Sequence, residues 1–252
     1  MSNLPSLFTA PLLQYLRQHP QLPKNTWYFI AAVTLTVINR PDEIPIIYKH
    51  ALDHVTTHYE GQVKLDEELK VLRRMREALL KTSAVTGAPK VINACLALKE
   101  ATPKHLQDID GDISTTGRRV DISEVPSSQV LQRGQDFFDK VYGKISSRVT
   151  RMMNSSGTED LDLIAKLMYG FILSNTTLLD QAETSYVLIA ALIPQDVNPQ
   201  LKGHLKGALN GGATLEEVRA VREVVIRLCE SAGMTRLDGA VGWGWRGEIA
   251  DI

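Results

Sequence analysis

Hydrophobic residues recur every three to four positions along most of this 252-residue chain. That spacing is typical of amphipathic α-helices, which bury one face and expose the other. We expect helices over residues 26–38, 43–60, 66–86, 89–100, 127–153, 159–176, 181–193, 199–210 and 215–231. No stretch alternates apolar and polar residues for long enough to predict a strand. The pattern therefore predicts an all-α fold.

Two segments are apolar on every side. They are "WYFIAAVTLTVI" (27–38) and "YVLIAALI" (186–193). A helix without a polar face is expected in the interior of a protein, so both should lie in the core. The first segment is too short to cross a bilayer.

The segment 108–128 divides the chain into two halves. It is rich in Gly, Asp, Ser and Thr and lacks helical periodicity, which is typical of a linker. The segments 76–94 and 222–240 share Arg, Glu, Gly and Ala at matching positions. We therefore expect a divergent N-terminal repeat at 1–107, a linker, and a related domain at 129–252 that arose by duplication. Chance similarity between two glycine-terminated helices is the alternative.

Composition and charge exclude several classes of function. The chain is 44% hydrophobic and 23% charged, with a net charge of −1. These values are typical of a globular protein and give no general attraction to nucleic acid or anionic membranes. Cys95 and Cys229 have neither metal nor redox spacing and stand in apolar surroundings, so we expect inert thiols in a reducing compartment.

The ends of the chain show no targeting signal. The N-terminus has prolines at 5 and 11 and only one arginine, which does not match a signal or transit peptide. The final residues, "ADI", are not a peroxisomal address. The sequence therefore predicts a cytoplasmic protein.

His204 lies on the apolar stripe of the helix predicted over 199–210. Leu201, His204, Leu205 and Ala208 share one face when the segment is wound as a helix. Spacing alone favours a core histidine whose hydrogen bonds are satisfied by neighbours. The surrounding glycines favour a site, because they lower helix stability and leave room either for close helix packing or for a ligand. These are Gly203, Gly207, Gly211 and Gly212.

Glu183 begins the second of the two apolar segments. Asp180 and Glu183 have the spacing of a capping box, as do Thr214 and Glu217. A structural capping role is therefore one interpretation of Glu183. The other is a carboxylate at the edge of the core, where it could pair with a histidine.

A metal site is a weaker hypothesis. His50, His54 and His58 follow one another at intervals of four residues on one predicted helical face. Two histidines at this spacing can chelate a metal, but no further ligand supports them here. A solvated polar face is the preferred interpretation, and we expect no metal and no cofactor.

The C-terminal half resembles the carboxymuconolactone decarboxylase family, which includes alkyl hydroperoxidase D. The resemblance is carried by residues 182–233, which contain the helix-starting Glu183 and "PQLKGHLKGALNGGAT", with support from 133–175. The first half resembles a second, more divergent copy. The resemblance implies an alkyl hydroperoxidase D-like helical bundle with two related copies in one chain. It also implies homo-oligomers such as trimers.

Two departures from that family narrow the implied chemistry. Val197 and Gln200 occupy the positions of the family's two redox cysteines, which excludes thiol peroxidase chemistry by that mechanism. Ile47 stands where the first copy would carry the counterpart of His204, so we expect no catalytic site in that copy.

The resemblance therefore implies a cofactor-independent decarboxylase or lactone isomerase, a carboxy-lyase type of enzyme. His204 would act as general acid and base near neutral pH, and Glu183 would orient it. Asn210, Gly207 and Lys202 would bind a small carboxylated lactone or related cyclic acid. A non-catalytic oligomeric scaffold and a residual peroxidase-like antioxidant protein are the alternatives.

Overall fold

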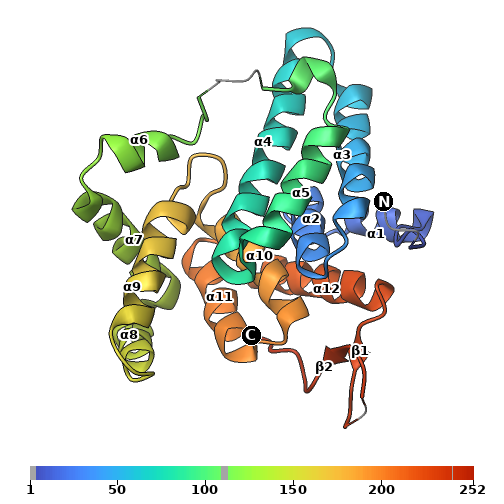
Figure 1. The fold of residues 1–252 in the computed structure, drawn as a ribbon. Helices are drawn as coiled ribbons and strands as arrows, with labels where there is room; N and C mark the ends of the chain where they lie inside the picture. Colours follow the sequence, from blue (N-terminus) through green and yellow to red (C-terminus); the bar gives the residue numbers. More distant parts are fainter. Residues whose placement is uncertain (1–3, 109–112, 240) are drawn as a thin grey trace.

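The computed structural model describes residues 4–108, 113–239 and 241–252, and these are mostly helical (Figure 1). The α-helices are α1 (Ala10–Gln18), α2 (Trp27–Val37), α3 (Ile44–His58), α4 (Gly61–Thr86), α5 (Ala88–Ala101), α6 (Arg118–Ser123), α7 (Ser127–Tyr142), α8 (Ser146–Asn154), α9 (Asp160–Leu167), α10 (Gln181–Leu192), α11 (Asn198–Asn210) and α12 (Leu215–Ser231). A π-helical segment, Met168–Leu173, continues α9. Two-residue strands β1 (Thr235–Arg236) and β2 (Gly244–Trp245) pair with each other. The all-α prediction is confirmed.

The predicted helices match most of the observed ones, with informative exceptions. The segment 127–153 forms two helices, because Gly143 takes a positive φ of 53° and ends α7 there. The segment 159–176 changes from α to π geometry at Met168. Helices α1 and α6 were not predicted, and α6 lies inside the expected linker 108–128.

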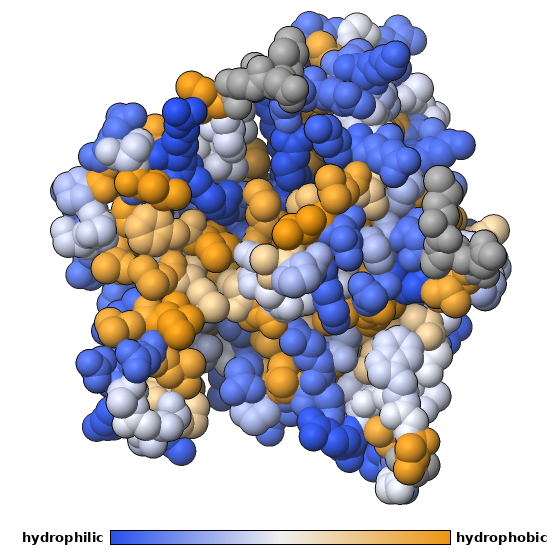
Figure 2. Space-filling model, in the orientation of Figure 1, coloured by the Kyte–Doolittle hydropathy of each residue, from blue (hydrophilic) through white to orange (hydrophobic). Residues whose placement is uncertain are grey.

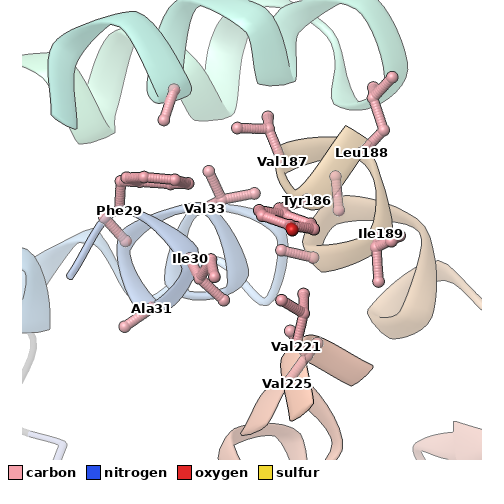
Figure 3. Close-up of a cluster of buried hydrophobic side chains, with 14 of the residues drawn as sticks. Phe29, Ile30, Ala31, Val33, Tyr186, Val187, Leu188, Ile189, Val221 and Val225 are labelled. Carbon is pink, nitrogen blue, oxygen red and sulfur yellow. The ribbon is translucent and has the colours of Figure 1, made fainter. Parts of the chain in front are cut away.

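The two apolar segments form the centre of the core, as predicted. Every residue of α2 is buried, and so is nearly all of α10. Figure 3 shows Phe29, Ile30 and Val33 of α2 beside the side chains of α10, with Val221 and Val225 of α12 completing the cluster. One hydrophobic core therefore contains residues from both halves of the chain.

The C-terminal segment packs back onto the helices. The Trp245 indole N–H donates to the carbonyl of Ile193 over 2.8 Å, and the Trp245 side chain is buried. The Arg222 guanidinium on α12 donates to the carbonyls of Ile249 and Ala250, each over 2.7 Å. These backbone contacts fix the tail in one position.

Helices α6 to α9 form a lobe beside the main body, on the left in Figure 1. Helix α7 joins this lobe to the rest through its contacts with the π-helical segment and α11. Helix α8 has no buried residue. The lobe thus exposes far more of its surface than the central helices do.

Candidate functional site

His204 points into the core, as its place on the apolar stripe predicts. It lies on α11 between the fully buried Leu201 and Ala208, and only 4% of its surface is exposed. Its ring stands edge-on to the ring of Tyr142 on α7, with centroids 5.9 Å apart. The site is therefore the place where α7 and α11 meet.

The glycines of α11 allow close helix packing. A Cβ on Gly203 would lie 2.7 Å from the Tyr142 ring, and one on Gly207 would lie 2.7 Å from the Val141 side chain. A Cβ on Gly211 would lie 2.9 Å from the backbone nitrogen of Ala182 on α10. Neighbouring helices therefore fill the space that these glycines leave, which favours the packing interpretation over a preformed ligand space.

His204 is a neutral imidazole with an unsatisfied nitrogen. Burial lowers the pKa of His204 to about 4, so the ring is uncharged at neutral pH. Its Nδ1 has no hydrogen-bond partner, and neither has the fully buried Ser185 Oγ on the facing side of α10. Each such group costs roughly 1–3 kcal/mol relative to a hydrogen-bonded one. Both lie along the glycine contact, since a Cβ on Gly207 would meet Ser185 Oγ at 3.5 Å.

Aromatic side chains surround the histidine on its α7 side. Phe138 contacts Tyr142 and Tyr169, with ring centroids 4.5 and 5.0 Å apart. Burial raises the pKa of both Tyr142 and Tyr169, so their hydroxyls remain protonated. Neither tyrosine was predicted from the sequence, where the available signal was an aromatic residue at each of positions 138, 142 and 169.

Glu183 is bound by other partners. Its carboxylate completes the capping box of α10, accepting from the Asp180 backbone N–H over 3.1 Å. It also forms an ion pair with Arg74 on α4, whose Nη1 donates to Oε2 over 3.1 Å. Between the described residues, no hydrogen bond or ion pair joins Glu183 to His204. The capping interpretation is confirmed, and the predicted Glu183–His204 pair is not observed.

The predicted substrate-binding residues do not converge on His204. The Asn210 side chain donates to the Val141 carbonyl over 3.0 Å, where it fastens α11 to α7. Lys202 and Lys206 are exposed to solvent. No residue of this set therefore places a positive charge beside the imidazole.

Lys81, Arg118 and Arg133 hold the end of the π-helical segment that carries Tyr169. The fully buried Lys81 donates to the carbonyls of Leu173 and Asn175, each over 2.7 Å, and to Thr184 Oγ1 over 2.9 Å. Arg118 donates to the carbonyls of Phe171 and Ile172, and Arg133 donates to that of Gly170. Glu77 and Asp121 pair with these two arginines. The network satisfies carbonyls at a helix end and fixes the position of Tyr169.

Burial lowers the pKa of Lys81 to about 7, against the opposing effect of Glu77. Lys81 was not predicted as a site residue, although the helical period places it on the buried face of α4.

The described cavities lie elsewhere. A groove of about 870 Å³ runs between α1 and α12, and one of about 600 Å³ lies between α12 and the C-terminal tail. A void of about 10 Å³, large enough for one water molecule, lies beside Tyr169 and Phe138. None of these three cavities is lined by His204.

The remaining candidates have structural roles. The His58 ring donates to the His54 carbonyl over 2.8 Å, and within the described ranges no three ligating side chains form a metal-binding cluster. Burial raises the pKa of both Cys95 and Cys229, so neither thiol is activated. Among the described residues, no helix has both the length and the hydropathy to cross a membrane.

The known proteins that this chain matches belong to a different family from the one that the sequence resembles. No protein-family model matches the chain. The chain is 33% identical to Peroxisomal protein 2 of Saccharomyces cerevisiae, across 91% of this chain and 96% of that protein. It is 35% identical to Peroxisomal protein 2 of Schizosaccharomyces pombe, across 82% and 87%.

These findings correct the family and the function inferred from the sequence. The assignment to the carboxymuconolactone decarboxylase family is wrong, since the matched relatives have another name and no family model supports it. The decarboxylase or lactone isomerase function, with its lyase class, is withdrawn together with its alternatives. The structure adds a physical reason, because a buried carboxylate would find no cation beside His204.

The predicted cytoplasmic location is also wrong, because both relatives are named as peroxisomal proteins. That prediction came from the absence of a recognised signal in "ADI". A missing signal is weak support for any location.

Proposed function

Because this chain belongs to the Peroxisomal protein 2 family, we propose that it acts in the peroxisome and that its functional centre is the buried junction of α7, α10 and α11 around His204. The location is supported by the names of two relatives that match over most of their length. The choice of this junction as the functional centre is supported by its two buried polar atoms that lack a hydrogen-bond partner.

One observation carries the choice of site. His204 Nδ1 and Ser185 Oγ are buried without a partner on facing helices. Native interiors pair nearly all buried polar groups, so two orphans at one junction indicate a role that outweighs their cost. Binding a small molecule that supplies the missing hydrogen bonds is such a role.

The chemistry of the junction selects the class of molecule. A neutral imidazole accepts a hydrogen bond or a proton through its free nitrogen, and serine and tyrosine hydroxyls can donate. No cation faces His204, so an anion would lose its hydration without compensation. The junction therefore fits a small uncharged molecule that carries a hydrogen-bond donor. Access requires α7 and α11 to separate, which would withdraw the Tyr142 and Val141 side chains from the glycines of α11 and break the hydrogen bond from Asn210 to the Val141 carbonyl.

The architecture supports the proposal that the two halves are related copies. Helices α2, α3 and α4 follow one another in the first half as α10, α11 and α12 do in the second. In each set the first helix is apolar all round and lies in the centre of the core. His204 belongs to α11, and α3 offers no counterpart to it at Ile47. The division into 1–107, 108–128 and 129–252 remains a prediction.

The location is tested by fluorescence microscopy in yeast. Full-length chain with a fluorescent protein on either terminus should coincide with a peroxisomal marker in at least one of the two fusions. Diffuse fluorescence from both fusions would contradict the peroxisomal location.

The site is tested by nuclear magnetic resonance with labelled histidine. Acetamide, a small neutral donor, should shift the His204 signals in a saturable manner, whereas acetate should not. His58, exposed on α3, is the internal control and should not respond. In the His204→Leu variant, the effect of acetamide on the signals of labelled Tyr142 should disappear. Equal responses to acetate and acetamide, or none at His204, would refute the proposed ligand class.

A further inference from the structure

Helix α9 buries one of its two aspartates and exposes its leucines. Asp162 is buried and pairs with Lys166 over 2.6 Å. The exposed apolar side chains are Leu161, Leu163, Ile164 and Leu167, with 46, 48, 48 and 52% of their surface accessible. An isolated amphipathic helix would have the opposite arrangement. The outer face of α9 therefore has the composition of a surface that another molecule covers.

Helix α8, which packs against α9, and the turn before it add apolar side chains to the same lobe. Ile145 and Met152 are 45 and 57% exposed. Figure 2 shows hydrophobic side chains gathered over the lobe where Figure 1 places α7 and α9. Together the six side chains expose apolar surface on the order of 500 Å², which is in the range of the largest patch on a single chain, a patch that is often functional.

Opposite charges border the same surface. Lys144, in the turn before α8, and Arg148 and Arg151 on α8 are exposed, whereas Glu159 and Asp160 are exposed at the start of α9. The structure gives none of these five side chains an ion pair with another described residue. Basic and acidic groups thus stand on one lobe without an ion-pair partner among the described residues, although Asp160 accepts a hydrogen bond from the Thr158 hydroxyl.

We propose that the α8–α9 surface, with its six apolar side chains and five charges, binds the same surface of a second copy of this chain. In a two-fold interface, a surface of one subunit contacts the same surface of the other subunit, and the two subunits are related by a half-turn. When the two copies pair antiparallel, the basic residues of α8 in each copy face the acidic residues at the start of α9 in the other copy. A surface carrying both signs of charge is complementary to itself in this arrangement.

The size of the surface agrees with a dimer. A stable interface covers about 800 Å² of each partner, with an apolar centre and a polar rim. The apolar side chains supply more than half of that area, and the charged rim of α8 and α9 supplies the remainder. An unrelated apolar partner would not require both basic and acidic groups around the apolar side chains, so these charges favour a second copy of the chain.

The first test measures the oligomeric state of the full chain by analytical ultracentrifugation. The wild type should be a dimer, and Leu163→Ser with Leu167→Ser should raise its dissociation constant roughly 30-fold or more. The matched control is Ile92→Ser with Leu96→Ser, an exposed pair at the same spacing on α5, which should leave the dimer intact. Circular dichroism and thermal unfolding verify that both variants fold.

The second test exchanges charges. Arg148→Glu with Arg151→Glu should weaken self-association by like-charge repulsion, and so should Glu159→Lys with Asp160→Lys. Mixed together, the two variants should form a heterodimer, because each reversed cluster then faces a cluster of opposite sign. Only a self-complementary interface predicts this rescue.

Several outcomes would overturn the proposal. A monomeric wild type would do so, as would a dimer that dissociates with the α5 variant instead of the α9 variant. A monomer that sediments with vesicles containing anionic lipid would assign the surface to a membrane. A failure of the mixed charge variants to associate would exclude the two-fold arrangement.

Discussion

The buried imidazole of His204 makes the stability of the folded chain depend on pH. Its pKa is about 4 in the fold against an ordinary 6.5, so between these values only the unfolded chain binds the proton. Stability should therefore fall as the pH drops from 6.5 to 4, by up to roughly 3 kcal/mol from this group. Urea unfolding across that range measures the loss.

The His204→Leu variant isolates that contribution. Leucine has a similar volume and no nitrogen to leave unsatisfied, so the variant should be as stable as the wild type or about 1 kcal/mol more stable at neutral pH. Its pH dependence should be weaker than that of the wild type. His58→Gln, a change at an exposed histidine, is the control and should keep the full dependence. An unchanged slope in His204→Leu would show that His204 does not stay neutral in the fold.

Replacing Lys81 should lower the free energy of unfolding far more than replacing an exposed lysine. Lys81→Met would leave the carbonyls of Leu173 and Asn175 without their donor and would isolate the buried Glu77 from one of its cations. We expect a loss of roughly 3 kcal/mol in the free energy of unfolding. Lys70→Met changes an exposed lysine on the same helix and should remain within about 0.5 kcal/mol of the wild type. Denaturant unfolding of both variants distinguishes the two positions.

At the scale of elements, the tightest helix contact is between α7 and the π-helical segment. A Cβ on Gly134 would lie 2.5 Å from the backbone nitrogen of Gly170. Backbone cannot move aside as a side-chain end can, so Gly134→Ala should destabilise the fold by about 3 kcal/mol despite the better helix propensity of alanine. Gly247→Ala, where a Cβ meets no atom within 4 Å, is the control. Equal melting temperatures for both variants would contradict this packing.

Element positions were largely predictable from the sequence, because helices depend on local periodicity and caps. The capping boxes at Asp180 and Thr214 fixed the starts of α10 and α12. The break at Gly143 and the π geometry after Met168 were not predicted. The break reflects the positive φ of Gly143, which the hydrophobic period alone does not reveal, whereas the π geometry accompanies the packing of Met168–Leu173 against α7, which a local pattern does not contain.

The candidate site was predictable only in part, for the same reason. The orientation of His204 follows from helical spacing and was correct. The partner of Glu183 was not, because Arg74 lies more than one hundred positions away and reaches it only through the fold. The pKa of His204 likewise follows from burial by Tyr142 and its neighbours on another helix.

At the scale of the whole molecule, the two halves share one core. Helices α2 and α10 are buried against each other, so separating the halves would expose both. Residues 1–107 and 108–252, the second of which keeps α6, should therefore bind a hydrophobic dye and lack a cooperative thermal transition when each is expressed alone. Coexpression of the two should restore the transition. Two independently cooperative fragments would contradict a shared core and would instead support separate domains.

The docked C-terminal tail provides an optical signal for the state of the chain. Trp245 is buried with its indole bonded to Ile193, whereas Trp243, two residues earlier, is 47% exposed. Release of the tail would bring Trp245 into water and shift its emission to longer wavelength. Replacing the other two tryptophans, with Trp27→Phe and Trp243→Phe, would leave Trp245 as the single tryptophan of the chain. The fluorescence of Trp245 would then report whether the tail detaches before the helices melt or together with them.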